Sequence, residues 1–397
     1  MTQRIPLLWL TLNLLGATNT WAAANSAPEQ SVDRPAGLGD QTSFPIGVWL
    51  QNPKNAAQYR AAGFNLYVGL WRGPTEEQLQ QLKQAGMRAV CHQNELALRH
   101  LDDPIIAGWM HQDEPDNAQS LGKGKGYGPP VTPDEVSDRY QRMRAADSSR
   151  PVLLNLGQGV AWDRWHGRGV RTNHPEDYPQ YVKACDIASF DIYPVTHSHA
   201  EVSGNLWYVA RGVERLVQWA GEGRSVWNCI ECTRINNKEQ RKPTPDQVRS
   251  MVWMSLIHGS RGLIYFVHEW QPRFNEAALL SDRPMYDAVS CINHRIQALA
   301  TVLNSPSVSG GVTVESAHAG VQIATMMKRD GARTYLFTAA MRGQPTRARF
   351  IVSGVTGLQH IDVLDEDRSL TIADGTFTDD FEPWGVHLYR IAGHEAP

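Results

Sequence analysis

Two glutamates stand at or just after the end of an apolar run of the sequence. Glu114 comes just after the run 105–112 and precedes Pro115, whereas Glu231 is the last residue of the run 225–231. A carboxylate at the end of an apolar strand is costly unless it is paired or used in chemistry. Two carboxyl groups on either side of a glycosidic bond can hydrolyse it, because one protonates the leaving oxygen and the other attacks the sugar or activates water. We predict that Glu114 and Glu231 form such a pair.

Ten further polar or aromatic residues stand at or near the ends of predicted strands. Flat aromatic faces stack on the CH faces of sugars, and carboxylate, amide and imidazole groups hydrogen-bond to sugar hydroxyls. We therefore predict that these residues bind an oligo- or polysaccharide: Trp49, Trp71, His92, Asp113, Asn155, Asp191, Tyr193, His268, Glu269 and Trp270.

Three of these residues have alternative interpretations. A shift of one residue in strand phase would turn Glu269 inward and make it a competing second carboxylate. We expect it instead to bind substrate or to form a structural pair. His92 and His268 could ligate a metal, but a metal-dependent barrel hydrolase usually has a His-x-His motif on its first strand, and the run 44–50 has none. We predict no metal and no cofactor.

The elements that would position these residues alternate along the chain. Short apolar, β-branched runs alternate with longer amphipathic ones from 44 to about 305, which is typical of repeated βα units. Eight units over about 260 residues fit a (β/α)8 barrel, whose active site lies at the carboxyl ends of the strands. The predicted strands are 44–50, 64–71, 87–92, 105–112, 151–156, 186–193, 225–231 and 263–270.

The segments between these runs carry helix start and stop signals. Thr75 begins a capping box, and Gly86 predicts a helix end. Thr132 and Thr244 are each followed by Pro, which favours the first position of a helix. An open, doubly wound sheet is the alternative fold. It needs a Gly-rich phosphate turn after an early strand, and none follows the run 44–50.

The pattern changes after about Ser305. Short alternating runs, separated by turn signals such as 329–331 and 373–375, replace helix-length periods. We predict an α/β fold in which a (β/α)8 barrel over 44–305 is followed by a small all-β sandwich over 306–397. The runs of the second domain are 311–315, 320–326, 334–338, 348–352, 361–364 and 385–391.

The amino-terminal residues 1–24 have the order of a secretory signal peptide, with Arg4 followed by an apolar stretch and then by three alanines ending at Ala24. We expect cleavage after Ala24, a linker over 25–43, and a secreted or periplasmic protein. The alternative is a membrane anchor, which needs about 18 or more apolar residues. Polar residues such as Asn13 interrupt this stretch, and no later segment is apolar enough to span a bilayer.

Overall composition excludes two other classes of protein. The 397 residues include 38 Lys and Arg against 41 Asp and Glu, which argues against a nucleic-acid binder with a basic surface. Hydrophobic residues make up 42%, as in globular proteins rather than disordered chains. Cys229 and Cys232 have the C-x-x-C spacing of half a redox or metal site, but no second pair accompanies them. We interpret them as buried strand residues.

The strand-end pattern resembles the clan A retaining glycoside hydrolases over roughly residues 44–305. These (β/α)8 enzymes carry an acid/base Glu at the end of strand four, typically in Asn-Glu-Pro, and a nucleophilic Glu at the end of strand seven. The resemblance implies that Glu114 is the acid/base and Glu231 the nucleophile. It also implies that Tyr193 contacts the nucleophile and that Trp270 lies under the sugar. The implied reaction is hydrolysis of a β-linked glycan by double displacement.

One residue departs from that pattern. Asp113 precedes Glu114, where the clan usually has Asn. An ionised Asp113 would raise the pKa of Glu114, which suits a general acid, but it cannot donate an amide hydrogen bond to a sugar hydroxyl. The alternative function is a non-catalytic carbohydrate-binding barrel, which need not keep both glutamates. An amidase or esterase lacks support, because the chain has no Gly-x-Ser-x-Gly motif.

Overall fold

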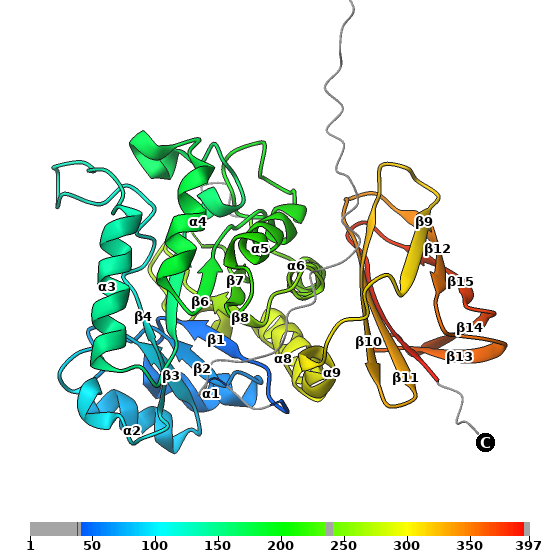
Figure 1. Ribbon diagram of the computed structural model, residues 1–397, viewed down its shortest axis with the longest axis horizontal. Coiled ribbons are helices and arrows are strands. Elements are labelled where there is room, and N and C mark those ends of the chain that lie inside the picture. Colours follow the sequence, from blue (N-terminus) through cyan, green and yellow to red (C-terminus); the bar gives the residue numbers. More distant parts are fainter. Residues whose placement is uncertain (1–37, 39–40, 236–240, 393–397) are drawn as a thin grey trace, which may run out of the picture.

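The computed structural model describes residues 38, 41–235 and 241–392. Eight parallel strands close into a barrel in which each strand pairs with the next and β8 pairs with β1 (Figure 1). The predicted barrel of eight parallel strands is confirmed, and each strand overlaps its predicted run. The strands are β1 (Ile46–Trp49), β2 (Leu66–Val68), β3 (Arg88–Cys91), β4 (Ile106–Met110), β5 (Val152–Leu156), β6 (Ile187–Phe190), β7 (Ser225–Glu231) and β8 (Gly262–Phe266).

Helices surround the barrel, and three of them begin at the predicted caps. Capping boxes form at Thr75 and Thr244, and the Thr132 hydroxyl caps a third helix. Gly86 ends a helix with a φ of 65°, which glycine adopts without a steric penalty. The α-helices are α1 (Ala56–Ala61), α2 (Glu76–Gln84), α3 (Pro133–Ala146), α4 (Tyr178–Tyr181), α5 (Trp207–Ala220), α6 (Pro245–Ile257), α7 (Ala278–Ser281), α8 (Arg283–Ala298) and α9 (Ala300–Asn304).

Two connections depart from the regular βα pattern. Between β3 and β4 the described chain forms only a 3-10 turn, and between β5 and β6 the single turn of α4 is accompanied by several 3-10 turns. Gly and Pro recur through 157–179, and both residues disfavour a long helix. The 3-10 turns are η1 (Pro53–Asn55), η2 (Ala97–His100), η3 (Gln158–Val160), η4 (His166–Arg171), η5 (Pro175–Asp177) and η6 (Val182–Ala184).

The inside of the barrel is a packed core. Alternate strand residues point inward, and Val68, Val90, Ile187 and Ile264 are fully buried there. Side chains therefore fill the space between the strands, as in other barrels of eight parallel strands. This packing leaves the ends of the strands as the places where a functional site can form.

The second domain is all-β, as predicted, and its eight strands pair in one continuous antiparallel sheet in the order β10-β11-β16-β13-β14-β15-β12-β9. Side chains such as Phe350, Phe377 and Tyr389 share one core inside it. Two of its strands, β14 and β15, fall outside the predicted runs, although the predicted turn 373–375 joins them. The strands are β9 (Val312–Ser316), β10 (Ile323–Asp330), β11 (Arg333–Ala340), β12 (Thr346–Val352), β13 (Leu358–Val363), β14 (Arg368–Ala373), β15 (Thr376–Phe381) and β16 (Val386–Ile391).

The two domains share a hydrophobic interface on the side of α6 (Figure 1). Trp253 of α6 stacks on Phe337 of β11, with ring centroids 5.2 Å apart. The Ser250 hydroxyl donates a 2.7 Å hydrogen bond to the Trp384 carbonyl. One cluster of buried side chains extends from the barrel helices into the sheet. The β domain is therefore held against the barrel by a continuous core.

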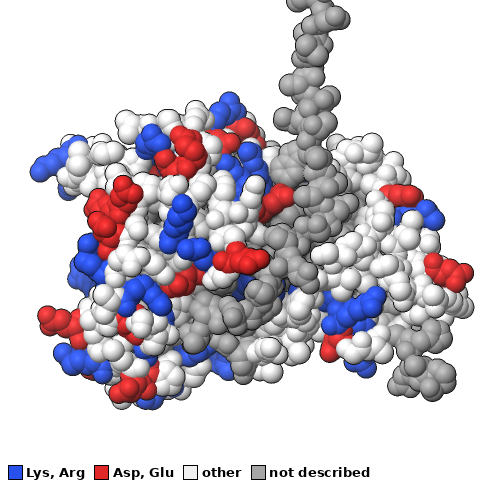
Figure 2. Space-filling model, in the orientation of Figure 1, with Lys and Arg blue, Asp and Glu red and all other residues white. Residues whose placement is uncertain are grey.

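The surface is mixed in charge. On the face shown in Figure 2, Lys and Arg side chains are interspersed with Asp and Glu, which matches the near-balanced charge of the sequence. No helix in the described ranges has the length and apolar character needed to cross a membrane. The predicted signal peptide, 1–24, lies outside the described residues.

Candidate active site

The carboxyl ends of the barrel strands bring three acids together. Asp113 and Glu114 follow β4, and Asp191 follows β6 directly. The side-chain amide of Asn155, in β5, donates a 3.0 Å hydrogen bond to Asp113. Glu114 lies near Asp191, whose charge raises the Glu114 pKa. We call Asp113, Glu114 and Asp191 the acid cluster.

Asn155 is itself held in place from inside the barrel. Its side chain is 3% exposed, and its Oδ1 atom accepts hydrogen bonds from the Ser189 hydroxyl at 2.7 Å and from the Cys229 thiol at 3.6 Å. Because Oδ1 is occupied by these donors, the NH₂ group is the part of the amide that faces Asp113. Asn155, predicted as a substrate-binding residue, therefore also positions the acid cluster.

Burial and the charges of neighbouring carboxylates raise the pKa of every member of the acid cluster. Burial, followed by the charges of Asp191 and Asp113, raises the pKa of Glu114 well above its usual value. Burial and the Asp113 charge raise the pKa of Asp191 to about 7, and desolvation of the Asp113 carboxyl group, together with the charge of Asp116, raises the pKa of Asp113 to about 6. The cluster therefore retains a proton at neutral pH, and Glu114 is suited to hold it.

The backbone also places Glu114 in an unusual way. Its φ is +43°, a left-handed conformation that is uncommon for residues other than glycine and is enriched at functional sites. The Glu114 amide donates a 3.1 Å hydrogen bond to the Asn155 carbonyl, and Gln119 donates one of 3.2 Å to the Glu114 carbonyl. The backbone on both sides of the side chain is thus fixed.

A fourth acid, Asp116, supports the acid cluster and was not predicted as a site residue. It is fully buried, and its carboxylate accepts hydrogen bonds of 2.9 Å from the Gly157 amide and from the Tyr178 hydroxyl. Arg168 donates a 3.2 Å hydrogen bond to its carbonyl. These bonds join the loop after β4 to the loop after β5. Asp116 is visible in the sequence as the last residue of Asp-Glu-Pro-Asp. Its hydrogen-bond partners come from distant segments, so its role could be found only from the fold.

Glu231, at the end of β7, has a different environment. It is 1% exposed, and its two carboxylate oxygens accept hydrogen bonds from the backbone amides of Val195 at 2.6 Å and Thr196 at 3.0 Å. Burial raises the pKa of Glu231 to about 7, while these donors and the nearby Arg241 oppose that rise. Donors favour the ionised form of a carboxyl group. Donors therefore offset part of the effect of burial at Glu231, whereas neighbouring carboxylates add to it at Glu114, so Glu231 ionises more readily than Glu114.

The loop after β6 therefore connects the two predicted catalytic residues. Asp191 at its start lies against Glu114, and the amides of Val195 and Thr196 hold Glu231. Tyr193 interacts with Asp191, and its ring packs on Phe266 with centroids 5.3 Å apart. The contact between Tyr193 and Glu231 that the resemblance implies is not among the hydrogen bonds of the described residues.

Exposed aromatic rings flank the end of β1. Trp71 follows β2 and is 65% exposed, and Trp270 follows β8 and is 50% exposed. Because β2 and β8 are the neighbours of β1, these rings lie on either side of it. Phe274, which was not predicted, pairs with Trp270 at a centroid distance of 4.8 Å. Trp49 is instead 7% exposed and belongs to the cluster inside the barrel, so it presents little surface to a ligand.

The two predicted histidines differ in exposure. His268 is buried, lies 3.3 Å from the Gln51 side-chain nitrogen, and stacks on Trp270 with centroids 6.2 Å apart. His92 is exposed, and its Nδ1 atom lies 3.2 Å from the Met110 carbonyl. Desolvation lowers the pKa of both rings. Both are therefore neutral near pH 7 and able to exchange hydrogen bonds with hydroxyl groups.

The remaining predicted residue, Glu269, forms an ion pair of 2.8 Å with Arg234. Of the two roles predicted for Glu269, substrate binding and a structural pair, this contact fits the structural pair. Cys229 and Cys232 are both buried, as predicted, although Cys232 lies one residue beyond the end of β7, and both are free thiols. Across the described ranges, no group of three or more His, Cys, Asp or Glu side chains is arranged to hold a metal ion.

Comparisons with known proteins identify a shared fold. No protein-family model and no curated protein matches the sequence. Among solved structures, a noncanonic maltogenic α-amylase from Thermotoga neapolitana aligns over 89% of this chain and 99% of its own, with a TM-score of 0.54 and 8% identity. An α-amylase from Geobacillus thermoleovorans, complexed with acarbose, aligns over 90% and 99%, with a TM-score of 0.51 and 9% identity.

An enzyme from a fungal source has a similar architecture. The α-galactosidase I of Mortierella vinacea aligns over 90% of this chain and 98% of its own, with a TM-score of 0.50 and 12% identity. All three alignments span both the barrel and the β domain of this chain. Similarity at such low identity shows a common fold, while the function must be argued from the residues of the site.

Proposed function

We propose that the protein is a retaining glycoside hydrolase that cleaves a β-linked glycan, with Glu114 as acid/base and Glu231 as nucleophile. The observation that carries this proposal is the contrast between the two glutamates. Burial and neighbouring carboxylates both raise the pKa of Glu114, whereas at Glu231 backbone donors oppose the effect of burial and hold its pKa to about 7. A glycosidase acid and its nucleophile require two carboxyl groups whose environments set their pKa values apart, so that one keeps its proton while the other ionises.

The proposed reaction has two steps. In the first, the Glu231 carboxylate attacks the anomeric carbon, the bond to the leaving oxygen breaks, and the Glu114 proton passes to that oxygen. In the second, the Glu114 carboxylate removes a proton from water, the water oxygen attacks the anomeric carbon, and the bond to Glu231 breaks. Both carboxyl groups return to their starting forms, and the sugar leaves with its original anomeric configuration.

Asp191 is the competing second carboxylate, and its position argues against that role. A retaining enzyme places its two carboxyl groups about 5–5.5 Å apart, on opposite sides of the sugar ring. Asp191 belongs to the same acid cluster as Glu114 and raises its pKa, so we place the two carboxyl groups on the same side of the sugar. We assign Asp191 instead to sharing and retaining the Glu114 proton.

Three further observations support a sugar substrate. The exposed rings of Trp71 and Trp270 offer stacking surfaces at the same end of the barrel as both glutamates. The solved structures that share the fold include enzymes named as amylases and an α-galactosidase. The near-balanced charge of the chain suits a weakly charged glycan. The β-linkage rests on the resemblance to clan A, and the signal-like residues 1–24 support export to the periplasm or medium.

The proposal is tested first by screening for product. The chain is incubated with aryl β-glycosides and with plant and bacterial polysaccharides, and the anomeric configuration of the first product is read by NMR. We expect release of sugar with retention. Binding of an oligosaccharide without any product would favour the alternative function, a non-catalytic carbohydrate-binding barrel.

The assignment of the two glutamates is then tested by azide rescue on the best substrate found. Glu231→Ala should abolish turnover, and added azide should restore it with formation of a glycosyl azide. Asp191→Ala is the matched control, which we expect to form no glycosyl azide. Wild-type turnover by Glu231→Ala would overturn the assignment. A glycosyl azide formed only by Asp191→Ala would transfer the role of nucleophile to Asp191.

A further inference from the structure

A small cavity lies where the barrel meets the β domain. Arg261 borders it just before the amino end of β8, and Lys328 borders it from β10. Its volume is about 20 Å³, which is room for one water molecule or one monatomic ion. Its remaining side chains are mostly apolar and include Val217, Ile257, Leu303 and Met326. The cavity lies at the opposite end of β8 from Trp270 and the other strand-end residues.

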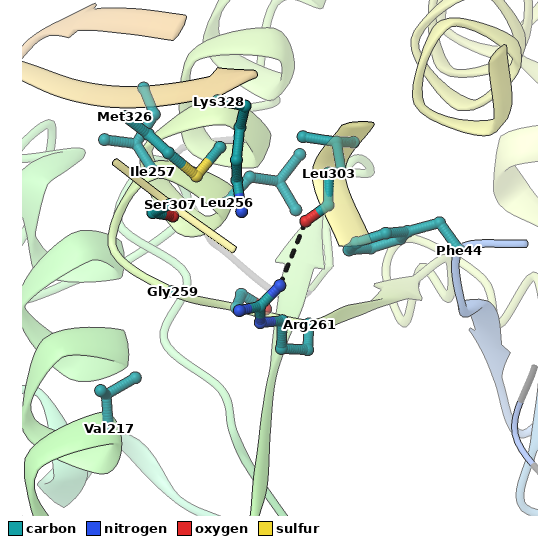
Figure 3. A pocket seen from close by; sticks show the side chains of 11 residues that line it. Phe44, Val217, Leu256, Ile257, Gly259, Arg261, Leu303, Ser307, Met326 and Lys328 are labelled. Atoms are coloured by element: carbon teal, nitrogen blue, oxygen red, sulfur yellow. Dashed lines mark hydrogen bonds between the residues drawn. The ribbon is translucent and has the colours of Figure 1, made fainter. Parts of the chain in front are cut away.

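Two cationic side chains point into this cavity from opposite sides, as Figure 3 shows. Lys328 is 1% exposed and donates a hydrogen bond to the Ser305 carbonyl. Arg261 donates one of 3.1 Å to the Leu303 carbonyl. An ammonium group has three N–H donors and a guanidinium five, so both groups keep donors for a further acceptor. None of the described residues that line the cavity is an Asp or Glu.

A buried ammonium group beside a partly exposed guanidinium group is costly when no carboxylate lines the same cavity. Burial, followed by the charge of Arg261, lowers the pKa of Lys328 to about 7. Loss of the Lys328 proton removes only part of the repulsion, because the guanidinium of Arg261 stays charged at every ordinary pH. An anion placed between the two groups compensates both charges and accepts hydrogen bonds from both.

We propose that a monatomic anion of the chloride class binds between Lys328 and Arg261 and joins the β domain to the barrel. The volume of the cavity selects a small anion, and the hydroxyl of Ser307, which also lines it, supplies a further polar group. Arg261 is partly exposed and provides a path for entry. This site is independent of the proposed activity, because its two cations lie at the other end of β8 from the acid cluster.

Thermal unfolding of the full chain in matched salts tests the proposal. The melting temperature is measured in sodium chloride, sodium bromide and sodium gluconate at equal ionic strength. Gluconate is too large for the cavity and serves as the reference anion. We expect chloride and bromide to raise the melting temperature by about 1–3 °C in a saturable manner. The effect should be larger below pH 7 than well above it, because the anion requires the ammonium form of Lys328.

Two variants separate this site from a general salt effect. Lys328→Met removes one charge while keeping the length of the side chain, and should abolish the difference between chloride and gluconate. Lys183→Met is the matched control, because Lys183 is exposed and its amine binds Gln180, and it should retain the full difference. Equal melting temperatures of the wild type in chloride and gluconate would overturn the proposal, as would a chloride response that survives in Lys328→Met.

A crystallographic measurement keeps the proposal testable even if Lys328→Met does not fold. Wild-type crystals soaked in bromide should give an anomalous peak between the Lys328 ammonium and the Arg261 guanidinium, and the peak should be absent from Arg261→Gln. A wild-type map without that peak would contradict the site.

Discussion

The two ends of the barrel both contain incompletely compensated charge, but of opposite sign. At the carboxyl end, burial and the charges of neighbouring carboxylates raise the pKa values of Asp113, Glu114 and Asp191. At the amino end of β8, Arg261 and burial lower the pKa of Lys328. In each case the surroundings favour the neutral form of the group. The acid cluster is partly open, since Asp113 is exposed and Glu114 half-buried, whereas Lys328 is 1% exposed.

Access to solvent decides what each set of charges can do. The proton of the acid cluster can pass to a bound molecule, and we therefore place the chemistry there. Lys328 is closed off from solvent, so its charge acts on stability.

The acid cluster and Lys328 change the stability of the fold with pH in opposite directions. Folded Asp191 binds its proton more tightly than the unfolded chain, so its contribution falls as pH rises from about 4 to about 7. Lys328 binds its proton less tightly in the folded state than in the unfolded chain, so its contribution to stability increases as pH rises above about 7.

The largest expected effect is a loss of turnover from the acid end alone. Glu114→Gln cannot donate a proton, so kcat on an unactivated glycoside should fall by about 10²–10⁴ while the melting temperature stays the same or rises. Lys328→Met should do the reverse and change the melting temperature with kcat/KM unchanged. Both variants are compared by steady-state kinetics and calorimetry. Full turnover by Glu114→Gln would contradict a catalytic role for the acid end. A Lys328→Met variant that folds but is inactive would contradict the separation of the two ends.

Two tryptophans extend the same contrast to apolar groups. Trp253 is 1% exposed and stacks on Phe337 at the domain interface, so Trp253→Ala should cost about 3–5 kcal/mol of unfolding free energy. Trp270 is 50% exposed, so Trp270→Ala should leave stability nearly unchanged and raise KM roughly 3- to 10-fold through lost stacking. Denaturant titration and substrate saturation curves measure the two effects. An unchanged KM would remove Trp270 from the binding site.

The sequence predicted the barrel because buried parallel strands are nearly continuous apolar runs with turn signals between them. It did not predict β14 (Arg368–Ala373) and β15 (Thr376–Phe381), whose runs include the charged residues Arg368 and Asp379, which form an ion pair only in the folded sheet. It also did not show that η2 replaces a helix between β3 and β4. Such local departures depend on tertiary packing more than on the pattern of one segment.

The candidate site divides in the same way. The positions of Glu114 and Glu231 follow from the strand ends, which the sequence marks clearly. The proximity of Glu114 and Asp191 depends on how closely β4 and β6 approach each other across β5. The pattern of residues along the sequence does not give the distance between two strands that are not neighbours. The amides that bind Glu231 belong to the backbone, so they cannot be predicted from the types of the residues that carry them. Likewise, Lys328 is buried only because β10 packs on the barrel.

Asp191→Asn tests the sharing of a proton at the acid end. Loss of the Asp191 charge should lower the pKa of Glu114, so the alkaline limb of the pH profile of kcat/KM should move to lower pH. The variant should also gain stability relative to the wild type as pH rises from about 4 to about 7, on the order of 2 kcal/mol. Asp138→Asn, in an exposed part of α3, is the control. An unmoved alkaline limb would show that Asp191 does not act on Glu114.

The smallest predicted effect concerns the donors at Glu231. Thr196 stabilises the Glu231 carboxylate through its amide and its hydroxyl, and Thr196→Val removes the hydroxyl while keeping the amide and the side-chain volume. The pKa of Glu231 should therefore rise, and the acidic limb of the kcat/KM profile should move to higher pH by a fraction of a unit, with the alkaline limb unchanged. Asp191→Asn should move only the alkaline limb. If both variants moved the same limb, Glu114 and Glu231 would not have the separate roles that their different surroundings indicate.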